Sequence, residues 1–237
     1  MMKPINSLAM DKNSLAMDKN AVSSAAALPA TPNVFLVDDD PSVRRALARL
    51  IKSAGHQVQT FASAEEFLGT RAAGEEAACL VLDVRMPGLT GIELQRQLQT
   101  LNRHVPIVFM TGHGNIPMSV QAMKAGAVDF LPKPVKDTDL LRAIEQALAR
   151  AVRDRAERNE LEDVRERVEK LTPREREVMV LVVRGLLNKQ IAFELGTVEK
   201  TIKVHRARVM EKMQVDSLAD LVRLAEKVGI PAKRQSS

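Results

Sequence analysis

The segment from Leu80 to Gly91, LVLDVRMPGLTG, constrains the fold of this chain more than any other. It begins as a continuous apolar run, stops at Asp83, and continues into a turn that contains Met-Pro-Gly. Such a run is typical of a strand that is buried on both faces. The abrupt stop predicts that the strand delivers one carboxylate to a loop at its carboxyl end.

Other apolar segments also end in polar side chains: one at Asp38, Asp39 and Asp40, one at Thr111, and one at Lys133. A helical pattern follows each predicted strand. The strands are predicted near Val34–Val37, Gln57–Phe61, Ala78–Asp83, Val105–Thr111 and Val128–Leu131. This alternation predicts an α/β domain with a doubly wound parallel sheet.

The predicted strand order is 2-1-3-4-5, as in flavodoxin-like folds. In that order a ligand crevice lies at the carboxyl ends of strands one and three, which carry Asp38, Asp39 and Asp83. Three carboxylates in one crevice repel one another unless they share a cation. Mg²⁺ is the natural candidate, because it prefers oxygen ligands and is often held by carboxylates together with a phosphate.

The neighbouring polar groups indicate phosphoryl chemistry. Thr111 offers a hydroxyl that can donate to a phosphoryl oxygen, and Lys133 offers a positive charge. With no His, Cys or Ser placed as a nucleophile, Asp83 is the predicted acceptor, forming an acyl phosphate by in-line displacement. Taken singly, the acidic run has an alternative interpretation as a helix cap, Thr111 as a loop hydroxyl and Lys133 as a surface charge.

This pattern resembles the receiver domain of response regulators over residues 33–149. The resemblance implies that a sensor histidine kinase phosphorylates Asp83. It also implies that Mg²⁺ is held by Asp39, Asp83 and the backbone carbonyl of Arg85, with Asp38 behind these ligands.

The same resemblance assigns a switching role to Phe130, which is expected to turn inward with Thr111 on phosphorylation. Core packing is the alternative for an aromatic residue on a strand. The segment TGHGNIPMSVQAMKAGAVDF further resembles the FixJ-like subgroup, and its His113 is interpreted as an ordinary loop residue. Val135 departs from the family, which often has Phe after Lys-Pro.

Two segments flank or follow this domain. Residues 1–32 contain the heptapeptide NSLAMDK twice and are predicted to be a disordered tail. Residues 150–170 are rich in interleaved charges and lack Gly and Pro, which predicts a helical linker. Four apolar residues at 3-4-3 spacing indicate either a coiled-coil seam or a partly covered spacer helix. They are Leu161, Val164, Val168 and Leu171.

A helix-turn-helix pattern follows the linker. The run TPRE from Thr172 forms a capping box with Pro at the first helical position, and Gly185 ends that helix. Asn188 can cap the next helix, Gly196 makes a tight corner, and a third helix is predicted over Glu199–Met213. The 13 basic and 8 acidic residues after position 170 predict a polyanion as partner.

Through LTPRERE, GLLNKQIAFELG and KTIKVHR, the chain resembles the LuxR-type, or NarL/FixJ-type, DNA-binding domain from residue 171 to about residue 228, and the predicted domain comprises residues 171–237. The resemblance makes Glu199–Met213 the recognition helix. Lys203, Val204 and Ala207 are then nearest the base edges, where Lys can bond guanine and the apolar side chains can touch thymine methyls. The other DNA contacts expected are Lys200, Thr201, Arg208, Asn188 and Lys189.

Two features of this domain leave alternatives open. Related domains usually have an apolar residue and then Ser or Thr before the recognition helix, whereas this chain has Thr197 and then Val198, which can shift the helix start by one residue. An apolar stripe on the last helix indicates either core packing or a dimer seam. It consists of Leu218, Leu221, Ala225 and Val228.

The whole sequence predicts a two-component response regulator that controls transcription and is not an enzyme. Phosphorylation is expected to favour a homodimer that binds an inverted repeat in duplex DNA and works with RNA polymerase. The single cysteine, Cys79, forms no disulfide within the chain and fits a reducing cytoplasm. No membrane partner is expected, because no apolar run approaches the length of a membrane span.

Other functions fit less well. A Mg²⁺-dependent phosphatase of the haloacid-dehalogenase type would share the carboxylate, hydroxyl and Lys, but needs a second Asp where this chain has Arg85. The intact acidic residues disfavour a phosphorylation-independent interaction module. Single-stranded nucleic acid is a poor candidate ligand, because the chain has no Trp or Tyr to stack on bases.

Overall fold

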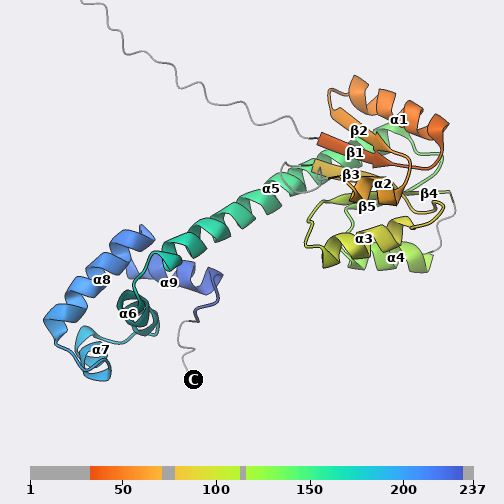
Figure 1. Cartoon of the computed structure of the whole chain (residues 1–237). Helices are drawn as coiled ribbons and strands as arrows, with labels where there is room; N and C mark the ends of the chain where they lie inside the picture. The colour runs from red at the N-terminus through yellow and green to blue at the C-terminus, as the bar shows by residue number, and fades with distance from the viewer. Residues whose placement is uncertain (1–32, 71–77, 113–115, 232–237) are drawn as a thin grey trace, which may run out of the picture. The chain divides into compact units, whose positions relative to one another are not determined.

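The computed structural model of the chain describes residues 33–70, 78–112 and 116–231. Within these ranges, a five-stranded parallel sheet has the predicted order β2-β1-β3-β4-β5 (Figure 1). Its strands are β1 Asn33–Val37, β2 Gln57–Phe61, β3 Ala78–Asp83, β4 Ile107–Thr111 and β5 Asp129–Pro132. The predictions for residues 1–32, His113 and residues 232–237 lie outside the described residues.

Helices cover both faces of this sheet (Figure 1). The helices α1 Pro41–Ser53 and α5 Asp137–Glu169 cover one face, and α2 Ala64–Leu68, α3 Gly91–Thr100 and α4 Ile116–Lys124 cover the other. Successive side chains of a strand point to opposite faces, so Val34 and Leu36 pack with α1 and α5, whereas Phe35 and Val37 pack with α2 to α4. Both layers therefore pack on the central strands β1, β3 and β4, which are buried on both faces, whereas most of β2 is exposed.

The single cysteine is a core residue of β3, as its place in the apolar run predicts. Cys79 has no exposed surface, and burial raises the pKa of its thiol to about 12. The thiol therefore stays protonated and packs as a small apolar group.

Side-chain caps begin two helices of the receiver domain. Asp40 is the N-cap of α1 and accepts a hydrogen bond from Ser42 N at 2.7 Å, so the helix-cap interpretation of the acidic run is correct for its third residue. The α3 helix begins with a capping box between Thr90 and Glu93. These caps set where the loops after β1 and β3 end.

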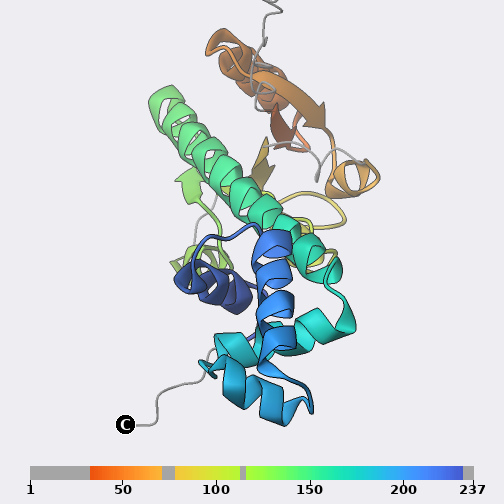
Figure 2. The ribbon, with the colours of Figure 1, turned by 90° about the vertical axis from the view of Figure 1, so that its left-hand side faces the viewer.

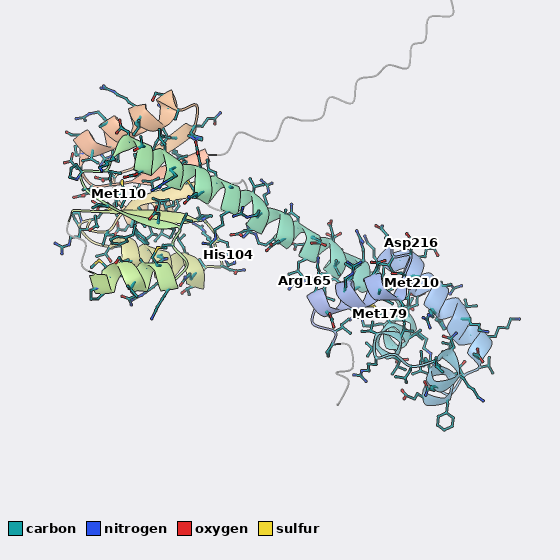
Figure 3. All side chains as sticks on the ribbon, turned by 180° about the vertical axis from the view of Figure 1, so that it is seen from behind. His104, Met110, Arg165, Met179, Met210 and Asp216 are labelled. Carbon is teal, nitrogen blue, oxygen red and sulfur yellow. The ribbon has the colours of Figure 1, made fainter. Side chains whose placement is uncertain are left out.

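The C-terminal helices form a second core (Figure 2). They are α6 Pro173–Val183, α7 Asn188–Glu194, α8 Glu199–Met213 and α9 Leu218–Lys227. The capping box between Thr172 and Glu175 is present, and α8 has the predicted bounds, with Val198 at its N-cap. Met179 lies in this core, whereas Met110 of β4 lies in the core beneath α1 and α5 (Figure 3).

The coiled-coil interpretation of the apolar linker residues is wrong for Val164 and Leu171. Val164, near the end of α5, is 2% exposed, and Leu171 is 6% exposed. Both belong to the C-terminal core, and Val168 packs against it. The helices of the C-terminal domain therefore cover these apolar residues, because the residues lie next to that domain in the chain and on the apolar side of α5.

No helix in the described part of the chain is long and apolar enough to cross a membrane.

The stripe on α9 also belongs mainly to this core. Leu221 and Ala225 are fully buried, and Val228 packs against the same cluster. Leu218, in contrast, is 40% exposed. Core packing thus accounts for most of the stripe.

A partly buried ion pair joins α8 to α6. Glu175 is 2% exposed and accepts hydrogen bonds from Lys212 Nζ at 2.6 Å and from Thr172 N at 2.9 Å. The Lys212 hydrogen bond, followed by that from Thr172, lowers the pKa of Glu175 to about 2. The sequence predicted the cap but gave no sign of its partner on α8.

We expect Glu175→Gln to lower the free energy of unfolding of the C-terminal domain by about 1.5–3 kcal/mol at neutral pH. Because folding depresses the pKa of Glu175, the wild-type contribution is complete above the ordinary value of 4.5 and is lost as pH falls toward about 2. Denaturant unfolding of the full chain at several pH values measures both effects. Glu177→Gln is the control, because its exposed pair with Arg174 should contribute at most about 1 kcal/mol to the free energy of unfolding. An equal loss of stability in both variants would contradict the stabilising role given to the Glu175–Lys212 pair.

Candidate acidic site and nucleic-acid interface

Three carboxylates meet at one edge of the sheet, as the strand order predicts. Asp38 and Asp39 directly follow β1, and Asp83 ends the neighbouring β3. Oxygen atoms from the three groups lie within 4.8 Å of one another. Asp38 is fully buried, Asp83 is 6% exposed, and Asp39 is exposed. This set of hard oxygen donors, reachable from solvent through Asp39, fits a divalent cation such as Mg²⁺.

The Lys133 ammonium bridges two of these carboxylates. Lys133 Nζ lies 2.7 Å from Asp38 Oδ2 and 2.6 Å from Asp83 Oδ2. Its backbone N donates to Thr111 O at 2.7 Å, which continues the β4–β5 pairing beyond the end of β5. The register of the sheet thus delivers a cation from strand five to the carboxylates of strands one and three.

Burial and charge act in opposite directions in this cluster. Burial raises the pKa of Asp38 above its ordinary value, although the hydrogen bond from Lys133 opposes this shift. Burial alone would lower the pKa of Lys133, but the hydrogen bonds and charges of Asp38 and Asp83 together raise it. Lys133 therefore remains charged at neutral pH and compensates much of the carboxylate repulsion.

Two supports of Asp38 were not anticipated from the sequence. The backbone N of Asp40 donates to Asp38 Oδ1 at 2.9 Å, and Arg44 Nη1 of α1 donates to the backbone oxygen of Asp38 at 2.5 Å. Both hold the loop after β1 in one conformation. Arg44 lies one helical turn after the cap residue Asp40. This spacing is too common in sequences to predict that Arg44 would support Asp38.

Gly91 gives similar support to Asp83. A Cβ atom at Gly91 would overlap the backbone oxygen of Asp83 and press on the Cα of Val84 at 3.1 Å. The backbone N of Gly91 donates to Val84 O at 3.0 Å. The start of α3 thus packs directly on the end of β3, which only glycine permits.

The structure places the remaining predicted site residues as follows. Thr111 is 1% exposed at the end of β4, next to β3 in the sheet. Arg85 has an exposed side chain, and its backbone N donates to Asp83 Oδ1 at 3.3 Å. Phe130 is half-buried, with its ring centroid 5.9 Å from that of Phe109. Phe130 thus packs on the core while keeping an exposed edge.

The helix α8, which is predicted to be the recognition helix, has one apolar side and one largely basic side. Ile202, Val209 and Met213 are fully buried. The residues predicted to face DNA lie opposite them, and all are exposed except Thr201, which is half-buried. The exposed ones are Lys200, Lys203, Val204, Ala207 and Arg208. The core therefore fixes which side of α8 is available to a ligand.

The expectation that Asn188 caps α7 is wrong. Leu187 precedes the helix, and its backbone N donates to Gln190 Oε1 at 2.8 Å. Asn188 is half-buried and accepts a hydrogen bond from Arg206 Nη1 of α8 at 3.2 Å, whereas Lys189 is exposed. Asn188 reaches across to α8 because it stands at the first residue of α7, one place after the cap.

A second arginine holds the corner between α7 and α8. Arg174 Nη2 of α6 donates to Leu195 O at 2.6 Å, immediately before Gly196, which has a φ of +62°. This bond satisfies a carbonyl at the end of α7. Arg174 and Arg206 thus help to fix the orientation of α7 relative to its neighbours α6 and α8. The sequence did not predict these contacts, because single arginines in a charged segment form no recognisable motif.

Comparison with known proteins identifies the families of both domains. A family described as "Response regulator receiver domain" matches residues 34–145, and one described as "Bacterial regulatory proteins, luxR family" matches residues 169–225. The chain therefore belongs to the response regulators that join a receiver domain to a LuxR-type DNA-binding domain. It is a transcriptional regulator of a two-component system and not a catalytic enzyme. The boundaries 1–32, 33–149, 150–170 and 171–237 stay predictions.

Within this class the chain is similar to FixJ-type regulators. It is 50% identical over 199 residues to Nodulation protein W of Bradyrhizobium diazoefficiens, covering 84% of this chain and 87% of that protein. It is 45% identical over 192 residues to Transcriptional regulatory protein FixJ of Rhizobium meliloti, covering 81% and 94%. The solved structure of response regulator StyR matches with a TM-score of 0.74 and 53% identity, covering 84% of this chain and 100% of that one.

Removing the ammonium of Lys133, which bridges Asp38 and Asp83, tests the electrostatics of the acidic site. Lys133→Ala should lower the free energy of unfolding of the receiver domain by about 3 kcal/mol without Mg²⁺, because buried Asp38 loses its charge partner. Added Mg²⁺ should raise the melting temperature more in the variant than in wild type, since no ammonium competes for the carboxylates. Thermal unfolding across a MgCl₂ titration measures this, with exposed Lys136→Ala as the control. An identical Mg²⁺ response in wild type, Lys133→Ala and Lys136→Ala would rule out competition between the Lys133 ammonium and Mg²⁺ for the carboxylates.

Proposed function

We propose that this protein accepts a phosphoryl group on Asp83 from a sensor histidine kinase and that this modification controls its binding to promoter DNA. The observation that carries the proposal is the contact of Lys133 with both Asp38 and Asp83 at the edge of the sheet. Charge compensation and positioning are what phosphoryl transfer chiefly requires of a protein. We infer that the protein works in the cytoplasm, where duplex promoter DNA is accessible.

The chemistry follows from the side chains present. A carboxylate oxygen of Asp83 attacks the phosphorus in line, an O–P bond forms, and the N–P bond to the kinase histidine breaks. Lys133 offers charge to the developing anion, and the Thr111 hydroxyl offers a hydrogen bond to a phosphoryl oxygen. Bound Mg²⁺ would neutralise phosphoryl charge, held by Asp39, Asp83 and the backbone carbonyl of Arg85. Asp38, whose oxygens already accept from Lys133 and Asp40, would stay behind these ligands.

Switching follows from the position of Phe130. Movement of Thr111 toward a phosphoryl group leaves space at the end of β4, and half-buried Phe130 on neighbouring β5 can turn into it. The surface formed by α4, β5 and α5 would then change and favour a homodimer. A nearly complete shift needs a differential affinity of about 5.5 kcal/mol, so partial dimerisation without phosphate is compatible with this scheme.

DNA recognition follows from the exposed side of α8. The N-terminal turns of a recognition helix enter the major groove, and a two-fold dimer reads an inverted repeat with half-sites about one helical turn apart. Lys203, Val204 and Ala207 would face base edges, and Lys200 and Arg208 would contact phosphates. Lys189 and Thr201 would add backbone contacts, and RNA polymerase is the expected partner at the promoter.

Asp83 should carry all Mg²⁺-dependent phosphorylation. Treatment with acetyl phosphate or phosphoramidate should add one phosphoryl group to wild type and none to Asp83→Asn, because only this carboxylate contacts Lys133 at the sheet edge while keeping some exposure. Intact-mass spectrometry measures incorporation, and sedimentation should show a higher average mass for wild type after phosphodonor treatment than before it, with no such increase for Asp83→Asn. Asp137→Asn, exposed at the start of α5, is the control. A phosphorylated Asp83→Asn protein would refute the assignment.

Lys203→Ala should weaken binding to the preferred duplex by about 1–3 kcal/mol and relax selectivity at one base position. Lys200→Ala, a matched change on the same exposed side, should weaken binding to every sequence alike and reduce the salt slope by about one unit. Competition binding with selected and random duplexes at several salt concentrations separates the two. If Lys203→Ala affects both duplexes equally, the base-reading side of α8 is misassigned.

A further inference from the structure

An ion pair stands on the exposed side of the recognition helix. Glu199 is the first residue of α8, and its Oε1 lies 3.2 Å from Nζ of Lys203, one helical turn later. The two side chains are 47% and 64% exposed, respectively. The pair therefore lies in the first two turns of the helix and is accessible to a ligand on this side.

The pair has only a small role in stability. An exposed pair at this spacing contributes about 0.2–0.5 kcal/mol to a helix. The negative charge of Glu199 also compensates the positive end of the helix dipole, where the N-cap Val198 has no side-chain acceptor to offer. Neither effect explains how a carboxylate can be accommodated beside the phosphates of DNA.

DNA binding changes the surroundings of Glu199. If Lys203 turns to a guanine, Glu199 loses its cation and faces the base edges of the major groove. Guanine O6 and N7 and thymine O4 are acceptors and repel a carboxylate, whereas the N4 amino group of cytosine donates. Adenine offers a donor at N6 beside an acceptor at N7, so it is the second choice.

We propose that Glu199 is a specificity-determining residue that accepts a hydrogen bond from a cytosine amino group next to the guanine bound by Lys203. This inference rests on the proposed function, because it requires α8 to enter the major groove. Glu199 and Lys203 form one reading unit: they neutralise each other in free protein and bind complementary base edges in the complex. Much of the selectivity comes from rejection, since guanine or thymine at the cytosine position leaves the carboxylate without a donor.

Glu199→Gln gives a test with a specific outcome. The amide of Gln can donate and accept at once, which suits N6 and N7 of adenine. Selection of duplexes from a random pool by the full-length phosphodonor-treated chain should therefore show a change from cytosine to adenine at one position of each half-site. The ratio of affinities for the two bases should change by about 5-fold or more, while preferences elsewhere stay the same.

The matched control is Glu211→Gln, which removes the same charge from an exposed position nearer the C-terminal end of α8. It should leave the base preferences unchanged. Glu199→Gln overturns the inference if it raises affinity for all duplexes alike, because Glu199 then acts only as a repulsive charge. A wild-type chain that selects no duplex at all overturns the proposed function as well, whereas selection by wild type with identical preferences in Glu199→Gln overturns this inference alone.

Discussion

The receiver domain depends on one electrostatic contact, that of the Lys133 ammonium with the carboxylates of Asp38 and Asp83. A fully buried carboxylate such as Asp38 is costly unless it is paired and hydrogen-bonded. Here Lys133, the backbone N of Asp40 and the sheet register together meet that requirement. The same contact makes the site responsive, because a phosphoryl group on Asp83 would compete for the ammonium that holds Asp38.

The C-terminal domain uses charge in the opposite way. Lys212 pairs there with the buried carboxylate of Glu175 and fixes α8 against α6, and Arg174 and Arg206 fix the corner before α8. These bonds and the apolar inner side of α8 leave its basic side exposed. In one domain the buried charges form the site proposed for phosphorylation. In the other they hold the helix whose exposed basic side is proposed to bind DNA.

One helix contributes to both cores. Leu140 and Ile144 near the start of α5 pack beneath the sheet, and Val164 near its end packs with the C-terminal helices. Arg167 Nη1 of the same helix donates to Met213 O, the last residue of α8, at 3.3 Å. A continuous backbone therefore links the domain that carries Asp83 to the helix proposed to read DNA.

The sequence by itself determined the alternation of strands and helices, the polar residues at the strand ends and the bounds of α8. These features rest on local signals: apolar runs that stop at charged residues, caps, glycine corners and a helical period. The strand order was predicted instead from the common order of flavodoxin-like folds, and the sheet has that order. Only the tertiary structure decided the partners of those groups. No local sequence pattern encodes these contacts, because they depend on rotamers and on packing between elements. They are Arg44 with the backbone of Asp38, Gly91 with Asp83, Lys212 with Glu175, and Arg206 with Asn188. The sequence left two interpretations of the apolar linker residues for the same reason: periodicity identifies the apolar side of a helix, but only packing identifies what covers it.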